Sequence, residues 1–392
     1  SALRVLCLQE DIADRVLAML KAAMRELTIG DPALLATDIG PVIDEEAQAG
    51  LLAHIEKMRA KGRAVFQLPP PAECAAGCFV PPTLIEIDAL ADLQREVFGP
   101  VVHVLRFAGD SLQPLLDAIN ATGYGLTLGL HSRIDETVQQ VVAGAHVGNI
   151  YVNRNMVGAV VGVQPFGGEG LSGTGPKAGG PLYLHRLAGS GSVPPVTLGC
   201  CPGELPTAVA SPLRHLAAWA DAAGRCELAG LCAEYAALSL RQAQIDLPGP
   251  TGERNSLHFA PRGPLLCLAG DEAGLLHQFA AVWAGGNTVV AVDGLASRKL
   301  LACLPAALTR EIRLQLPDNY AGVVGVLFAG SNADAALVRQ RLASEPGALI
   351  PLHQPDDGNC RYPLYRMLAE RVVSVNTAAA GGNTALMTLG ER

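Results

Sequence analysis

Two spacings of apolar residues alternate along the chain, and each predicts a different element. Residues 4–9, with the apolar run V-L-C-L at 5–8, predict a buried strand. Apolar residues then recur every three or four positions from residue 12 to residue 27, which predicts a helix capped by Asp11. A second helix is predicted at residues 45–61, with Gly62 as its end.

The alternation continues to about residue 153. The stretch at 79–87 is predicted to enter a strand after Pro81 and Pro82. Further strands are predicted at 101–107, 126–131 and 148–153, and helices at 112–120 after Ser111 and at 136–145 after Asp135. Strands joined by helices pair in parallel, since a parallel pair needs a long crossover connection. The first part of the chain is therefore predicted to be an α/β structure with a mostly parallel sheet.

A second alternating region follows a segment rich in glycine and proline. Residues 188–205 contain seven Gly or Pro residues, which predicts a linker at 188–212. Helices at about 212–223 and 227–244, a strand at 264–269, a helix at 273–283 and a strand at 288–292 come next, with more such units up to about residue 369. The last piece, 370–392, predicts two strands around a glycine-rich turn, too few to form a core alone. The predicted domains are therefore 1–187, 213–369 and this tail at 370–392.

Composition narrows the classes of function. The chain has 392 residues, 49% of them hydrophobic, which suits two or three domains with buried cores. Its formal net charge is −8, which argues against nucleic-acid binding. No apolar stretch is long enough to span a bilayer, and no signal peptide is recognisable. The ten cysteines lack paired C-x-x-C spacing, so no metal site is expected. The cysteines are expected to be reduced thiols of a cytoplasmic protein.

Two short segments carry candidate chemistry. In E-V-F-G-P at residues 96–100, the carboxylate of Glu96 offers two acceptor oxygens that suit the hydroxyls of a sugar, and Phe98 offers a flat face. On these five residues alone, a turn glutamate and a core phenylalanine are the favoured interpretation. Residues 151–168 end a strand and turn through glycines and a proline onto Phe166.

Six motifs occur in an order typical of one family. They are G-D-P…T-D-I-G-P at 30–41, F-V-P-P-T-L at 79–84, E-V-F-G-P at 96–100, N-A-T-G-Y-G-L-T-L-G-L at 120–130, the strand and loop from residue 151, and Q-P-F-G-G at 164–168. With them the chain resembles the aldehyde dehydrogenase superfamily. The resemblance implies that NAD is the cofactor, that Glu96 binds the nicotinamide ribose and that Phe98 packs near the nicotinamide.

The same resemblance implies that part of the reaction machinery is not in this chain. The family reaction needs a thiolate nucleophile, an oxyanion-stabilising amide, a general base and a dinucleotide domain. By family order all of them are expected before Ser1, with the cysteine directly before it, so no catalytic residue is assigned here. Cys7 is the nearest thiol, but its apolar strand predicts a buried, inert group. The chain alone is therefore expected to be inactive.

Within the superfamily the chain is similar to L-glutamate γ-semialdehyde dehydrogenases of proline catabolism. The small pair Gly158 and Ala159 before Phe166 and the stretch at 173–184 carry this similarity. It implies that Ser1, Gly158, Ala159 and Phe166 anchor the substrate. Backbone N–H groups of a glycine-rich loop are able to hold a carboxylate. Taken singly, an ordinary turn at Gly158, packing at Ala159, a core ring at Phe166 and a disordered terminus at Ser1 remain equally good interpretations.

The second half resembles the dinucleotide domain of the same superfamily, with its chemical groups replaced. Segments 261–270 and 284–293 carry the likeness, but residues 270–273 stand where an oxyanion amide is expected and Val292 and Asp293 where a cofactor-binding lysine is expected. A degenerate Rossmann-like domain is therefore predicted, followed by a short β-flap. A second working cofactor site is the alternative, because an acidic residue suits ribose hydroxyls.

The whole layout is similar to the long forms of the bifunctional proline utilization A flavoenzymes, with the likeness extending to residues 248–255 and 370–390. This implies upstream domains of the same polypeptide as partners, with FAD only in an upstream proline dehydrogenase domain that associates peripherally with a membrane. It also implies a C-terminal cover over the path of the intermediate, with a homo-oligomer left open. Two alternatives stay open: a non-catalytic scaffold, and a dehydrogenase for another carboxylated aldehyde.

Overall fold

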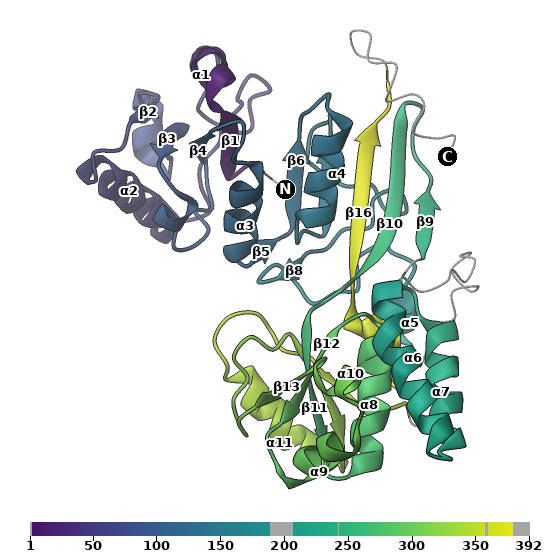
Figure 1. The fold of residues 1–392 in the computed structure, drawn as a ribbon. Coiled ribbons are helices and arrows are strands. Elements are labelled where there is room, and N and C mark those ends of the chain that lie inside the picture. The colour runs from purple at the N-terminus through teal and green to yellow at the C-terminus, as the bar shows by residue number, and fades with distance from the viewer. Residues whose placement is uncertain (1, 189–206, 242, 357–359, 379–392) are drawn as a thin grey trace. The chain divides into compact units, whose positions relative to one another are not determined.

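The computed structural model describes residues 2–188, 207–241, 243–356 and 360–378. The chain forms two compact units, Ser1–Thr122 and Gly123–Arg392. Each unit is an α/β structure, as the alternating pattern predicts. Figure 1 shows the order of the elements along the chain.

The first unit is built on one four-stranded sheet in the order β1-β4-β3-β2. The strands are β1 (Val5–Gln9), β2 (Val65–Gln67), β3 (Thr83–Ile87) and β4 (Val101–Phe107). β1, β4 and β3 are parallel, and β2 is an antiparallel edge. Apolar residues of α1 (Glu10–Arg25) cover one face, and those of α2 (Glu45–Ala60) and α3 (Leu112–Ala121) cover the other. Two short 3₁₀ helices, η1 (Ala72–Ala76) and η2 (Leu90–Asp92), lie in the connections.

The predicted helix caps need correction. α1 begins at Glu10, so Asp11 lies inside its first turn and does not cap it. α4 (Asp135–Gly144) likewise begins at Asp135 itself. Both aspartates still favour their helices, because a negative charge in the first turn interacts well with the helix dipole. Ser111 precedes α3 as predicted, but its hydroxyl bonds to Asp110 rather than to the helix.

The second unit contains a mixed sheet in the order β6-β7-β16-β10-β9. Its strands are β6 (Thr127–Leu130), β7 (Asn149–Val152), β9 (Gln244–Leu247), β10 (Glu253–Pro261) and β16 (Leu368–Asn376), and a separate pair joins β5 (Tyr124–Gly125) to β8 (Glu169–Gly170). β16 pairs in parallel with β7 and antiparallel with β10 over nine residue pairs (Figure 1). The strand predicted at the start of the tail is therefore an interior strand of this sheet. The remainder of the predicted flap, from residue 379, lies outside the described residues.

A parallel five-stranded sheet follows, in the order β13-β12-β11-β14-β15. Its strands are β11 (Pro264–Ala269), β12 (Thr288–Val292), β13 (Ile312–Gln315), β14 (Gly325–Ala329) and β15 (Leu352–His353). Numbered from β11, this is strand order 3-2-1-4-5, that of a doubly wound dinucleotide-binding fold. The predicted Rossmann-like fold is confirmed.

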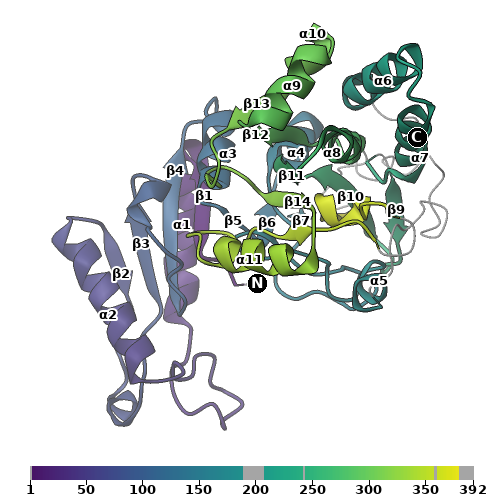
Figure 2. The same ribbon diagram turned by 90° about the horizontal axis from the view of Figure 1, so that it is seen from below.

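Helices cover both faces of this parallel sheet. One face packs against α6 (Thr207–Ala222), α7 (Cys226–Leu238), α8 (Glu272–Ala284), α9 (Leu295–Cys303) and α10 (Ala306–Thr309), and the other against α11 (Asn332–Ala343). Figure 2 shows α11 on one side of β14 and α8 on the other. The short helices α5 (Tyr183–Leu187) and η4 (Leu364–Met367) complete the described elements.

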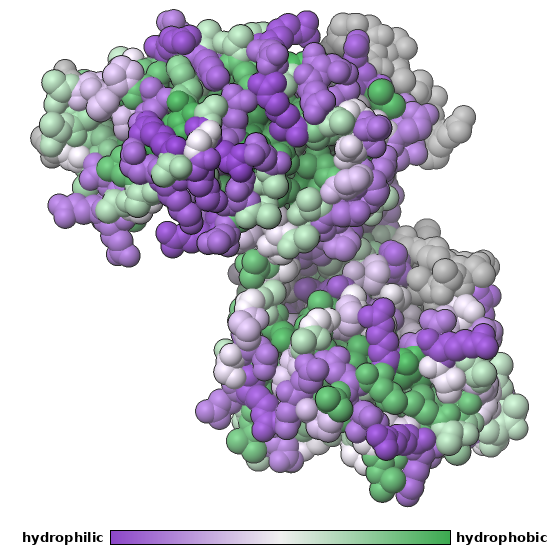
Figure 3. Space-filling model, turned by 60° about the vertical axis from the view of Figure 1, so that its left-hand side comes forward, coloured by the Kyte–Doolittle hydropathy of each residue, from purple (hydrophilic) through white to green (hydrophobic). Residues whose placement is uncertain are grey.

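The boundary between the two compact units falls between residues 122 and 123, inside the predicted domain 1–187. The reason is the pairing of β7 with β16, which joins residues 127–152 to the second half of the chain. The predicted boundaries at 187, 212 and 369 stay predictions. None of the helices in the described part is long and apolar enough to cross a membrane. The visible face of each unit mixes hydrophilic and hydrophobic residues (Figure 3).

Candidate functional site

The predicted anchor residues Gly158 and Ala159 lie on the loop at residues 153–168, which follows β7 and is called the anchor loop. The loop leaves the strand through Asn153, whose φ of 56° is left-handed and whose side chain exchanges two hydrogen bonds with the backbone of Ser132, at 3.0 and 2.9 Å. Gly158 and Gly162 have φ of +76° and +78°, the region that only glycine adopts easily. The glycines are therefore needed for the path of this loop.

The amides of the loop fall into two sets. The amide of Val160 donates to Oε1 of Gln164 at 2.9 Å, and the amide of Gln164 donates to the Val160 carbonyl at 2.9 Å. No group in the described part of the chain accepts from the amides of Gly158 or Ala159, and both residues are exposed. A Cβ built on Gly158 meets no atom within 4 Å. Two consecutive main-chain donors thus lie in exposed residues, without an acceptor among the described residues, where the anchor is predicted.

Phe166 is fixed by its backbone. Its amide donates to the Ala178 carbonyl at 3.0 Å and its carbonyl accepts from the Ala178 amide at 2.8 Å. The residue is half-buried, so it is neither a core ring nor a free one. Ser1, the fourth predicted anchor residue, lies outside the described residues.

Glu253, at the start of β10, contacts two residues of the anchor loop, Arg154 and Gln164. Its side chain is 14% exposed and forms an ion pair with Arg154, which is 18% exposed. The same carboxylate accepts from Nε2 of Gln164 and, at 2.9 Å, from Nδ2 of Asn255. Sequence reasoning assigned no role to these residues, although the turn-rich motif at 248–255 contains two of them. Their contribution depends on partners some 90 residues away, which no local pattern reveals.

Lys177 bonds to the C-terminal end of the anchor loop, at Gly167. It is 2% exposed, and Nζ donates to Oδ1 of Asn149 at 2.8 Å and to the carbonyl of Gly167. Nδ2 of Asn149 donates in turn to the Pro165 carbonyl at 2.9 Å. Burial lowers the pKa of Lys177 to about 8, against the opposing charge of Glu370. Both arms of the anchor loop are therefore tied to neighbouring strands.

The predicted cofactor residues lie in the first unit. The Phe98 side chain is 74% exposed, so the core-ring interpretation is wrong, and the Glu96 side chain is 45% exposed. Arg4, which sequence reasoning missed, joins them: its Nε lies 3.1 Å from Oε1 of Glu96, and its Cζ lies 4.3 Å from the Phe98 ring centroid. Within the described residues no donor occupies Oε2 of Glu96. An accessible carboxylate oxygen beside an accessible ring fits a ribose carrying a flat heterocycle.

Cys7 does not have the properties of a nucleophile. Burial in β1 raises the pKa of its thiol to about 11, so the thiolate is scarce at neutral pH. In the doubly wound part, Asp293 at the end of β12 is paired with Arg298, with oxygen–nitrogen distances of 2.6 and 2.9 Å. The acidic residue that suits a second ribose site is thus engaged by a neighbouring arginine.

Known proteins share sequence similarity with this chain over part or all of its length. The sequence profile of the aldehyde dehydrogenase family matches residues 1–191. Over its whole length the chain is 50% identical to the bifunctional protein PutA of Escherichia coli (strain K12) and 43% identical to that of Rhizobium meliloti. It covers 30% and 32% of those proteins, so it spans about a third of the length of these curated relatives.

Two further relatives extend the comparison. Over 45% of its length the chain is 40% identical to the 1-pyrroline-5-carboxylate dehydrogenase of Geobacillus kaustophilus (strain HTA426), of which it covers 34%. The structure of Proline Utilization A (PutA) from Corynebacterium freiburgense aligns with 96% of this chain and 35% of its own, with a TM-score of 0.66 and 22% identity. That likeness shows that the two share a fold.

Proposed function

Because residues 1–191 of this chain belong to the aldehyde dehydrogenase family, we propose that it forms part of a bifunctional enzyme of proline catabolism that oxidises L-glutamate γ-semialdehyde to glutamate with NAD. The observation that carries this proposal is the pair of exposed, unpaired amides at Gly158 and Ala159. The relatives named PutA and 1-pyrroline-5-carboxylate dehydrogenase support it, since 1-pyrroline-5-carboxylate is the cyclic imine of this semialdehyde.

The substrate has a carboxylate at one end and an aldehyde at the other. In this proposal the amides of Gly158 and Ala159 donate to the carboxylate, and Phe166 packs against the aliphatic part. Hydrogen bonds from main-chain N–H groups to a carboxylate are charge-assisted and therefore strong. Because the loop is held by Glu253 on one arm and by Lys177 on the other, it pays little entropy on binding and fixes the distance to the reacting carbon.

NAD, when bound, accepts the hydride released from the aldehyde carbon. The free oxygen of Glu96 would accept hydrogen bonds from the ribose hydroxyls, and the exposed Phe98 ring would pack against the nicotinamide. Arg4 keeps both side chains in place through its ion pair with Glu96 and its position over the Phe98 ring. The thiolate nucleophile and the dinucleotide domain are proposed to come from the preceding part of the same polypeptide.

Three wider assignments belong to the same proposal. The FAD-dependent proline dehydrogenase would be an upstream domain of the polypeptide. The doubly wound region and the segment from β16 onward would cover the dehydrogenase and help to channel the intermediate. The enzyme would be cytoplasmic.

Substrate comparison in the full-length enzyme tests the function. NADH formation is measured with L-glutamate γ-semialdehyde, with a second carboxylated aldehyde, succinate semialdehyde, and with butanal, which has no carboxylate. The proposal expects kcat/KM to be highest for the first and lowest for butanal. Equal values for all three would refute it, and a preference for succinate semialdehyde would assign the loop to another carboxylated aldehyde.

A further inference from the structure

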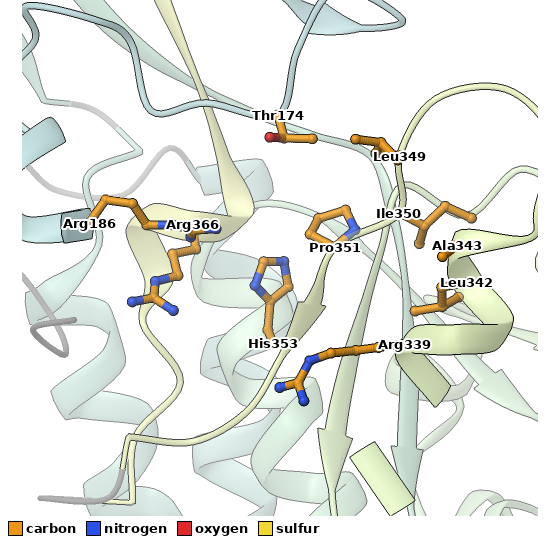
Figure 4. Close-up of a pocket in the computed structure, with 10 residues that line it drawn as sticks. All are labelled: Thr174, Arg186, Arg339, Leu342, Ala343, Leu349, Ile350, Pro351, His353 and Arg366. Atoms are coloured by element: carbon orange, nitrogen blue, oxygen red, sulfur yellow. The ribbon is translucent and has the colours of Figure 1, made fainter. Parts of the chain in front are cut away.

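A pocket of about 250 Å³ lies at the amino edge of the doubly wound sheet. Its walls come from the end of α11, from residues 349–351 leading into β15, from Thr174 and from α5 and η4 (Figure 4). A dinucleotide in such a fold lies at the carboxyl edge of the sheet. In this chain Asp271 and Ser331, the N-caps of α8 and α11, mark that opposite edge. The pocket is therefore separate from the degenerate cofactor site.

The polar side of the pocket is positively charged. Arg186, Arg339 and Arg366 line it, and no aspartate or glutamate does. None of the three arginines forms a salt bridge with a carboxylate in the described part of the chain. Burial lowers the pKa of Arg186, and the nearby charge of Arg366 lowers it further. Like charges held together without a counter-ion repel each other, so an anion placed between them is favoured.

His353 supplies an independent sign of a missing partner. The residue is 4% exposed, and its Nε2 is buried without any hydrogen-bond partner among the described residues. In Figure 4 its ring lies between Arg366 on one side and Arg339 and Leu342 on the other, at the wall of the pocket. A Cβ on Gly325 would lie 3.4 Å from this nitrogen and 2.8 Å from Cδ2 of Leu265, so the imidazole packs closely beside the backbone of β14. Buried polar atoms are nearly always bonded, and this unbonded one belongs to a residue that lines the pocket.

We propose that this pocket binds a phosphate monoester of a small apolar group. The phosphate would lie between Arg186 and Arg366, beside His353. Three guanidinium groups and an imidazole offer more N–H donors than a carboxylate has lone pairs to accept, whereas a dianionic phosphate has three acceptor oxygens. The opposite wall, formed by Leu342, Leu349 and Ile350, would contact the apolar group.

Titration calorimetry of the chain in chloride buffer at neutral pH and constant ionic strength tests the proposal. The probes are phenyl phosphate, inorganic phosphate and benzoate. We expect phenyl phosphate to bind most tightly, because only it combines the dianion with an apolar group. The double variant R186Q/R366Q should bind it at least about tenfold more weakly, the effect expected when two charged donors are lost. The control variant R313Q removes the charge of one exposed arginine on β13 and should leave affinity unaltered.

Thermal melting separates a binding defect from a folding defect. Without ligand, R186Q/R366Q should melt no lower than the wild type, because two like charges without a carboxylate partner are removed. With phenyl phosphate, only the wild type and R313Q should gain stability. If the double variant fails to fold, the exposed Arg339→Gln variant takes its place, with an expected loss of about threefold. Absence of saturable binding, equal affinity in the arginine variants and R313Q, or tighter binding of benzoate than of phenyl phosphate would each overturn the proposal. Equal binding of inorganic phosphate and phenyl phosphate would overturn the assignment to a monoester.

Discussion

Replacing Glu253 by glutamine tests whether β10 supports the anchor loop. In the wild type this carboxylate accepts hydrogen bonds from Arg154, Gln164 and Asn255. Glutamine keeps one acceptor oxygen and turns an NH₂ group toward donors, so it leaves the guanidinium of Arg154 mostly buried without a counter-charge. Breaking a buried pair by removing one partner costs about 3–5 kcal/mol, and the partial exposure of both side chains reduces this to about 3 kcal/mol.

Equilibrium denaturant unfolding followed by tryptophan fluorescence measures this loss. Both tryptophans of the chain, Trp219 and Trp283, pack in the core of the second unit, so the signal reports the unit that contains Glu253. The double variant R154M/E253Q should recover about 2 kcal/mol relative to the sum of the single variants, because no unpaired charge remains. Strictly additive effects, or a loss below about 0.5 kcal/mol in E253Q, would refute the idea that this pair holds the loop.

Two further predictions concern buried basic side chains. Lys177→Met should lower the free energy of unfolding by about 2 kcal/mol, since the Gly167 carbonyl and Oδ1 of Asn149 lose the ammonium group as a donor, and an unchanged unfolding curve would contradict the assigned contacts. Burial lowers the pKa of His353 from 6.5 to about 3. The unfolded chain therefore binds the proton more readily, so the contribution of His353 to stability is complete above pH 6.5 and falls as the pH drops toward 3, by about 2 kcal/mol at pH 5. His353→Gln should flatten this part of the stability–pH curve, and an identical slope in the variant would show that His353 is not buried in the neutral form.

Sequence patterns were sufficient for elements whose apolar spacing is local. The strand predicted at 101–107 is β4, and the strand predicted at 264–269 is β11. The stretch at 79–87 enters its strand at Thr83, after Pro81 and Pro82, which have no N–H to donate. A boundary shifted where a segment finds another partner. The helix predicted to residue 244 ends at Leu238, where the Ser239 hydroxyl bonds to the Ala284 carbonyl.

Contacts between distant segments were beyond the reach of sequence patterns. β16 lies between β7 and β10, and no local pattern specifies which of several apolar strands pair. Arg4 and Glu253 act on residues 92 and 89 positions away, and their own neighbours in sequence look like ordinary surface segments. The resemblance indicated which residues of the loop are candidates, but the structure was needed to show which amides are already bonded.

The most direct test of the account compares Gly158→Leu with Gly162→Leu in the full-length enzyme. Both glycines have a positive φ and open space around the built Cβ, so the two variants carry similar backbone strain and only the first places a side chain at the proposed carboxylate site. Kinetics with L-glutamate γ-semialdehyde and with butanal give kcat/KM for each variant. We expect Gly158→Leu to lose about 100-fold with the semialdehyde, or ~3 kcal/mol for two charge-assisted hydrogen bonds, and little with butanal, while Gly162→Leu retains the wild-type ratio. An equal loss with both aldehydes, or the same loss in both variants, would contradict the assignment of these amides as the substrate anchor.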